Sequence, residues 1–183
     1  AHDTESHVLA SGIGGRYLAP RAAEHEKETI VTKREDFESN TNYAQGGMAV
    51  VQAGSDSFRL HVRDTLVAGA GLCHPDVVKE TVRQAPGALA ELVELGVRFS
   101  REQGRLELGR EGGHSERRIV HAGDYTGREI ERAVLETVQR HPNIALFENH
   151  LAVDLLLASH AAGQERSARA NVSPTASWTW IWL

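Results

Sequence analysis

The sequence predicts an α/β fold in which helices flank a parallel sheet. Three observations favour this class: a short apolar run at residues 7–10, a glycine-rich turn directly after it, and a β-branched run at residues 29–32. A helix-like stretch at about residues 16–25 joins the turn to the second run. The order strand, glycine turn, helix, strand opens a doubly wound, Rossmann-like nucleotide-binding sheet.

Four residues weaken this opening unit. A buried parallel strand is normally a continuous apolar run, and Ser6 and His7 interrupt the first strand while Glu28 intrudes on the second. Pro20 lies inside the expected helix, where it removes one backbone hydrogen bond and crowds the preceding turn. We therefore expect an imperfect copy of the nucleotide-binding unit.

Helical periodicity predicts four further helices along the chain. Phe58, Val62 and Leu66 fall at helical spacing in the first of them, Pro75 suits the first turn of the second, and Gly96 would cap the third. The expected helices cover about residues 57–69, 75–82, 87–95 and 126–140.

Two segments between these helices, residues 36–47 and 106–119, are polar and rich in glycine, so we expect loops there. Residues 143–147 and 151–157 are apolar and predict two more strands. We expect residues 1–160 to form a partial, incomplete cofactor-binding domain with helical insertions, and residues 161–183 to form a divergent, loose tail.

Composition excludes several classes of function. The 183 residues suffice for one well-built domain, and a net charge of −5 without a basic cluster argues against nucleic-acid binding. No apolar run approaches the roughly 20 residues of a membrane span, and the polar start does not resemble a signal peptide, so we expect a cytoplasmic protein. The single cysteine, Cys73, is expected to be a buried apolar residue, and the ten scattered histidines offer no metal-ligand spacing.

The glycine-rich turn carries the first candidate site. A dinucleotide fingerprint uses three glycines, and here the second and third are present as Gly12 and Gly15 while Ala10 occupies the first position. The amides of the following helix would then hold a pyrophosphate. The alternative is an ordinary strand-to-helix turn. Lys33 follows the second strand, where such folds meet the adenosine ribose, and by itself it could equally be a solvated charge.

The second candidate site is the loop of residues 110–115. Its paired glycines would let backbone amides approach an anion, and neighbouring arginines could hold carboxylates. Glu111 could pair with a substrate ammonium group. The alternative is an exposed polar loop whose charges satisfy one another.

Together, these segments resemble the L-aspartate oxidases, a branch of the succinate dehydrogenase and fumarate reductase flavoproteins. The resemblance covers about residues 7–157 and fades after about residue 165. It rests on four strings in the family's order and spacing: residues 39–47 (SNTNYAQGG), 64–73 (DTLVAGAGLC), 110–115 (REGGHS) and 124–129 (DYTGRE).

The resemblance implies FAD-dependent oxidation of L-aspartate to iminoaspartate, the first step towards quinolinate and NAD, with oxygen or fumarate reoxidising the flavin. It implies that Glu111 orients the substrate through its amino group and that His114 contributes to the substrate site. The implied FAD contacts are Ser11, Gly12, Ile13, Gly14, Lys33, Asn40, Thr41, Asn42, Tyr43, Ala44, Gln45, Gly46, Gly47, Leu151 and Ala152.

Ala10, Arg16 and Tyr17 depart from the family's usual small or apolar residues, and family members are much longer than this chain. We therefore expect an amino-terminal fragment that is inactive alone. One alternative is a non-catalytic fragment that binds FAD weakly or not at all and self-associates through uncovered apolar faces. The other is a flavoprotein of the succinate or fumarate type, against which Glu111 and residues 43–47 argue.

Overall fold

The computed structural model describes residues 6–10, 12–157 and 178–182 of the chain. The fold divides into two compact units. The first combines Ala1–Glu38 with Val138–Leu183, and the second is Ser39–Thr137. The expected α/β class is confirmed, since the first unit holds a parallel sheet with a helix between its first two strands.

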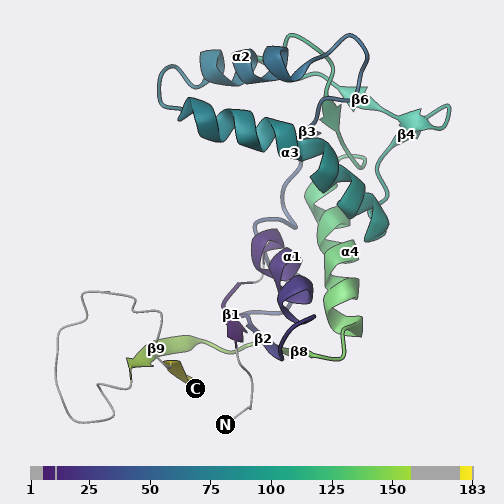
Figure 1. Ribbon diagram of the computed structural model, residues 1–183. Coiled ribbons are helices and arrows are strands. Elements are labelled where there is room, and N and C mark those ends of the chain that lie inside the picture. Colours follow the sequence, from purple (N-terminus) through teal and green to yellow (C-terminus); the bar gives the residue numbers. More distant parts are fainter. Residues whose placement is uncertain (1–5, 11, 158–177, 183) are drawn as a thin grey trace. The chain divides into compact units, whose positions relative to one another are not determined.

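The sheet of the first unit has three parallel strands in the order β1 (Ser6–Val8), β2 (Glu28–Val31) and β8 (Ile144–Phe147). Helix α1 (Ile13–Ala22) connects β1 to β2 and lies beside them (Figure 1). The core of this unit is apolar: Ala19 of α1, Ile30 of β2 and Val138 are almost fully buried together. The predicted strand, turn, helix and strand are thus present, each beginning slightly earlier than expected.

The polar residues that weaken the sequence pattern face one another in this sheet. Ser6 and Glu28 are register partners across β1 and β2, and the Ser6 hydroxyl donates a hydrogen bond to the Glu28 carboxylate. Glu28 is almost fully buried, as is Arg16 on α1. Pro20 lies in the last turn of α1 without ending the helix. The hydrogen bond offsets part of the cost of burying Glu28, since the other carboxylate oxygen, Oε2, is buried without a hydrogen-bond partner.

A second pair of strands belongs to the same unit. Strand β9 (Ala152–Leu157) pairs antiparallel with β10 (Trp178–Trp182). The expected strand at residues 151–157 is confirmed. Most of the expected loose tail, residues 161–183, lies outside the described residues, and its described part is β10.

The second unit combines helices with very short strands. Helix α2 packs along α3 (Figure 1), and a small antiparallel sheet has the strand order β3-β7-β6. The bounds of its elements are α2 (Phe58–Ala68), α3 (Pro75–Glu94), α4 (Thr126–Arg140), β3 (Met48–Ala49), β4 (Arg101–Glu102), β5 (Arg105–Leu106), β6 (Leu108–Gly109) and β7 (Ile119–Val120). Helix α4 agrees with the predicted helix at 126–140, and its last residues belong to the first unit.

Two expectations for this unit are wrong. The helices expected at 75–82 and 87–95 form one helix, α3, with Pro86 inside it. Val82, Leu89 and Leu92 are buried along one face on both sides of Pro86, and this shared burial outweighs the single hydrogen bond that proline removes. The segment 106–119, expected to be a loop, contains strand β6 and runs into β7. Within the described residues, none of the helices is long and apolar enough to span a membrane.

Candidate functional site

A pocket of about 290 Å³ opens in the first unit beyond the carboxyl ends of β1 and β2. In doubly wound sheets, ligands bind at this edge. The pocket brings together three of the predicted cofactor residues, Lys33, Leu151 and Ala152. The other lining residues are Leu9, Ala10, Val31, Thr32, Arg34, Glu38 and His150.

Backbone hydrogen bonds continue the pairing of β2 and β8 into the walls of this pocket. The Thr32 amide donates to the Phe147 carbonyl (2.9 Å), and the His150 amide donates back to the Thr32 carbonyl (3.0 Å). The Asp36 amide also donates to the Glu148 carboxylate (2.6 Å). The segments that carry Lys33 and Leu151 are therefore fixed against each other by the backbone.

One glycine of the turn after β1 makes the close helix–strand contact that a dinucleotide fingerprint uses. Gly12 is the N-cap of α1, and a Cβ atom at Gly14 would meet nothing within 4 Å, so the surrounding described atoms do not require glycine at Gly14. A Cβ atom at Gly15 would lie 2.6 Å from the Ala10 Cβ atom and 2.8 Å from Val8 Cγ1. Gly15 thus provides the close contact between helix and strand and makes room for Ala10. Ser11 lies outside the described residues.

The predicted cofactor loop, residues 40–47, belongs to the second unit. The Ala44 amide donates to the Thr41 carbonyl (3.1 Å), and the Gly127 amide at the start of α4 donates to the Ala44 carbonyl (3.0 Å). A Cβ atom at Gly127 would overlap the Thr41 carbonyl oxygen, and one at Gly47 would overlap Ile119 Cγ2 and the Val120 carbonyl oxygen. Glycine at these two positions lets the loop lie directly against α4 and β7.

A second pocket, of about 510 Å³, joins this loop to the predicted substrate residue. Gln45 and Gly47 line it together with Glu111. Its charged side chains include both signs, so the pocket can bind a molecule that carries an ammonium group and carboxylates. The remaining lining residues are Gly109, Arg110, Ile119, His121, Gly123, Asp124 and Tyr125. His114, the other predicted substrate residue, is not among them.

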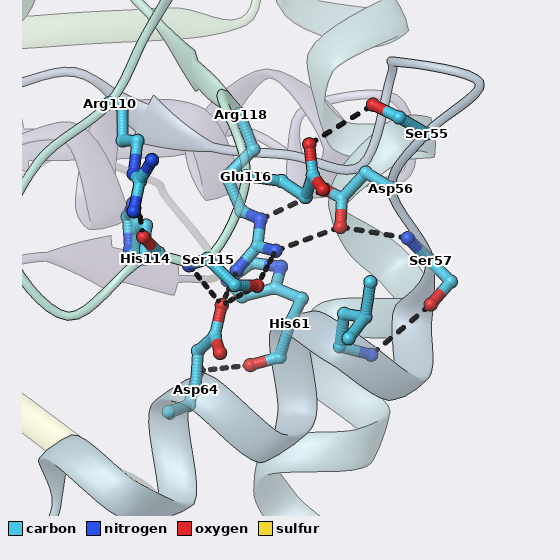
Figure 2. Close-up of polar contacts among 12 residues, drawn as sticks. Ser55, Asp56, Ser57, His61, Asp64, Arg110, His114, Ser115, Glu116 and Arg118 are labelled. Carbon is cyan, nitrogen blue, oxygen red and sulfur yellow. Dashed lines mark hydrogen bonds and ion pairs between the residues drawn. The ribbon is translucent and has the colours of Figure 1, made fainter.

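A buried ion-pair network contacts the loop of residues 110–115 at Ser115 (Figure 2). Arg118 is fully buried and binds the Asp56 carboxylate through two nitrogens, each 2.8 Å from a carboxylate oxygen. A third nitrogen of Arg118 lies 2.6 Å from the Asp64 carboxylate. The same carboxylate accepts hydrogen bonds from the Ser115 amide (2.8 Å) and hydroxyl (2.7 Å). Arg118 is therefore engaged by the protein's own acids.

The network shifts the pKa of its own member Asp64 and of the neighbouring His61. Burial raises the pKa of Asp64, but the hydrogen bonds from Ser115 and the ion pair with Arg118 outweigh it and lower the pKa to about 2. Burial lowers the pKa of His61, and the charges of Arg118 and His114 lower it further. The rings of His61 and His114 meet edge to face, with centroids 6.1 Å apart.

The sequence interpretation did not single out Asp56, His61 or Asp64 as site residues. Their one signal was that Asp64 opens a string shared with the L-aspartate oxidases. Their partner Arg118 lies more than 50 residues away along the chain, which a local pattern cannot reveal. Among the described residues, no group of three or more histidine, cysteine or acidic side chains is arranged to hold a metal ion.

A family model described as FAD binding domain matches residues 8–174 of the chain. Curated relatives include L-aspartate oxidase 2-a, chloroplastic, of Nicotiana tabacum, which is 51% identical over 150 residues (81% of this chain and 23% of the relative). The L-aspartate oxidase of Pseudomonas aeruginosa is 44% identical, with 81% of this chain and 29% of the relative covered. The chain thus spans about a quarter to a third of these relatives' length.

Solved structures of other proteins are also similar to the chain. E. coli quinol fumarate reductase FrdA superposes with a TM-score of 0.76 and 31% identity over 82% of this chain and 26% of its own. A further quinol-fumarate reductase, solved with menaquinol molecules, gives a TM-score of 0.78 and 29% identity over 84% of this chain and 27% of its own.

Proposed function

The chain belongs to the family of FAD binding domains, and from this premise we propose that it serves in the oxidation of L-aspartate to iminoaspartate. In this proposal it supplies part of the FAD site and the carboxylate that orients the substrate. The observation that carries the proposal is the second-unit pocket, in which Glu111 lies with Gln45 and Gly47 of the cofactor loop.

The residues present fit FAD in each unit taken by itself. In the first unit, Lys33, Leu151 and Ala152 line the pocket at the carboxyl ends of the strands, and Gly12 opens the helix that would face the pyrophosphate. In the second unit, the loop at 40–47 is held by Gly127 and β7 with its outer side accessible. FAD, when bound, supplies the hydride acceptor, and the protein supplies binding, orientation and charge.

Glu111 is the residue from which we infer L-aspartate as the substrate. Its exposed carboxylate lines a pocket that also contains Arg110 and His121. A carboxylate attracts an ammonium group, whereas an arginine can bind a carboxylate through two parallel hydrogen bonds. This combination favours an amino dicarboxylate such as L-aspartate over succinate. Fumarate, which lacks the amino group, is proposed as an electron acceptor.

The test compares the chain with its Glu111→Gln variant, both saturated with FAD, by titration with L-aspartate and with succinate. We expect the variant to lose about tenfold in affinity for L-aspartate, the size of one charge-assisted contact, and to bind succinate as before. Glu24→Gln, at an exposed acid of the first unit, is the matched control and should change neither affinity. Equal losses for both ligands in Glu111→Gln would contradict the orienting role.

A second candidate is a non-catalytic chain, favoured by Ala10 in place of the first glycine of the dinucleotide fingerprint. In that case the chain alone should not consume oxygen with L-aspartate, even when loaded with FAD. Val67, Leu72 and Val77 of the second unit are largely exposed apolar side chains, which supports a proposed tendency to self-associate. Sedimentation velocity tests it: a single monomeric species at all concentrations would contradict self-association.

A third candidate is oxidation of succinate or reduction of fumarate, favoured by the likeness to quinol fumarate reductase. The Glu111→Gln titration decides between this candidate and aspartate oxidation, because a succinate-type site would not weaken selectively for L-aspartate.

A cytoplasmic location is proposed from the sequence alone, and the plant relatives are named chloroplastic.

A further inference from the structure

The ion-pair network of Asp56, Asp64, Ser115 and Arg118 reaches the loop that carries Glu111 (Figure 2). We propose that Asp64 is a positioning residue: through Ser115 it holds the loop of residues 110–115 in the conformation that presents Glu111 to the substrate. This inference rests on the proposed function, because it assigns Asp64 the task of placing the substrate-orienting carboxylate.

Arg118 makes Asp64 a fixed point. The guanidinium group is fully buried and binds Asp56 just before α2 and Asp64 within α2, eight residues later. Planar, two-point pairing with Asp56 fixes the orientation of the guanidinium group. The Asp56 carboxylate also accepts the Ser57 amide (2.7 Å), which ties the network to the start of α2. The position of the Asp64 carboxylate is therefore set by α2, which carries it, and by its ion pair with Arg118.

Asp64 in turn holds one end of the loop. One oxygen, Oδ2, accepts the Ser115 amide and hydroxyl as well as Arg118 Nη1. Ser115 itself is exposed, and no regular secondary structure surrounds it. These two hydrogen bonds to a charged acceptor are therefore the strongest restraint that the described contacts place on it.

The loop transmits this restraint to Glu111 through its own hydrogen bonds. The His114 amide donates to the Glu111 carbonyl (3.2 Å), and Arg110 Nε donates to the His114 carbonyl (2.9 Å). Gly113 closes this turn with a positive φ of 84°. A displacement at Ser115 thus moves a closed turn as a unit, and Glu111 with it.

Among the residues that the structure describes, the loop of residues 110–115 has no other polar anchor to α2. His61 of α2 is buried and meets the His114 ring edge to face, yet the buried Nδ1 atoms of both rings have no hydrogen-bond partner. The contact between the two rings contributes packing, but no hydrogen bond between them fixes the orientation of the loop on α2. Polar orientation of the loop on α2 therefore depends on Asp64.

The first test needs no ligand. Amide hydrogen exchange of the chain is compared with that of Asp64→Asn, and Asp76→Asn, at an exposed acid in the first turn of α3, is the matched control. We expect Asp64→Asn to speed exchange of the hydrogen-bonded His114 and Ser115 amides by about tenfold or more while amides of α4 keep their rates, because local opening is separable from global unfolding. Unchanged exchange in the loop, or equal acceleration throughout the second unit, would overturn the proposal.

The second test separates positioning from the proposed function. FAD-saturated Asp64→Asn is titrated with L-aspartate and with succinate beside Glu111→Gln. We expect both variants to lose the preference for L-aspartate while succinate affinity is unchanged. Loss in Glu111→Gln but not in Asp64→Asn contradicts the positioning role alone. No effect of Glu111→Gln contradicts the proposed function, and hydrogen exchange then decides whether Asp64 holds the loop.

Should Asp64→Asn fail to fold, Ser115→Ala provides the same comparison with a milder change. It removes the Ser115 hydroxyl donor and keeps the hydrogen bond from the backbone amide of residue 115 to Asp64. We expect faster exchange of the residue 114 and 115 amides than in the unsubstituted chain and a partial loss of the preference for L-aspartate. Unaltered exchange and an unaltered preference would overturn the proposal.

Discussion

At the scale of single residues, two adjacent glycines of the cofactor loop differ sharply in what surrounds them. A Cβ atom at Gly47 would overlap Ile119 and the backbone of Val120, whereas one at Gly46 would meet nothing within 4 Å. We expect Gly47→Ala to lower the free energy of unfolding by about 1–3 kcal/mol, since the β7 backbone must move. Gly46→Ala should change the free energy of unfolding by less than about 0.5 kcal/mol. Thermal unfolding of both variants tests this, and equal melting temperatures would show that the loop does not pack on β7.

Lys33 carries a second residue-scale prediction. It lines the first-unit pocket at the end of β2, where the adenosine ribose of the proposed FAD would lie, and the FAD diphosphate next to that ribose is anionic. Lys33→Glu should weaken FAD binding by about tenfold, because repulsion replaces attraction at a partly screened site. Lys27→Glu makes the same change at an exposed position outside that pocket and should leave the affinity intact. The measurement is a fluorescence titration of FAD, and an equal loss in both variants would point to net charge instead of a contact.

The structure brings some of the predicted site residues together in one pocket, and the sequence missed other residues for a clear reason. Lys33 and Leu151 follow strands that pair in parallel, so a pattern of strands is enough to place them in one pocket. Asp64 and Arg118 are brought together only by the packing of the second unit. No spacing rule connects a helix residue to a charge in a distant irregular segment.

At the scale of elements, α2 depends on its amino-terminal cap. The Ser57 hydroxyl accepts the Leu60 amide at 3.2 Å. Ser57→Ala should cost about 1 kcal/mol of unfolding free energy, because that amide loses its partner. Ser55→Ala, which removes only an exposed hydrogen bond to Glu116, should cost much less. Urea denaturation of both variants checks the difference, and similar midpoints would mean that α2 is held by packing alone.

Elements also show where local patterns give the wrong answer. The sequence predicted two separate helices, at 75–82 and 87–95, yet the buried face of Val82, Leu89 and Leu92 continues past Pro86 as one helix. Ser6 and Glu28 each weakened a strand when read singly. Their pairing in register satisfies one oxygen of the buried Glu28 carboxylate, and this pairing becomes visible only once β1 and β2 lie side by side. In each case, tertiary packing overrides a preference that is weak by itself.

At the scale of the whole molecule, His61 predicts how stability depends on pH. Burial, Arg118 and His114 hold its folded-state pKa below the ordinary value of 6.5. Below about pH 6.5 the unfolded chain therefore binds a proton that the folded chain does not, so stability falls as the pH drops towards the folded-state pKa. His61→Gln should make the decline in melting temperature between pH 6.5 and 5 shallower, and His25→Gln, at an exposed position, should not. An unchanged slope in His61→Gln would contradict this.

The central claim is that this chain retains an FAD site, and direct titration of the purified chain with FAD tests it best. The fit of the glycine turn, the pocket around Lys33 and the loop at 40–47 predicts saturable binding in the micromolar range, with a perturbed visible flavin spectrum. A flavin band that co-purifies with the chain would be the strongest form of this result. No spectral change at saturating FAD would contradict the account and leave the chain as a non-catalytic member of its family.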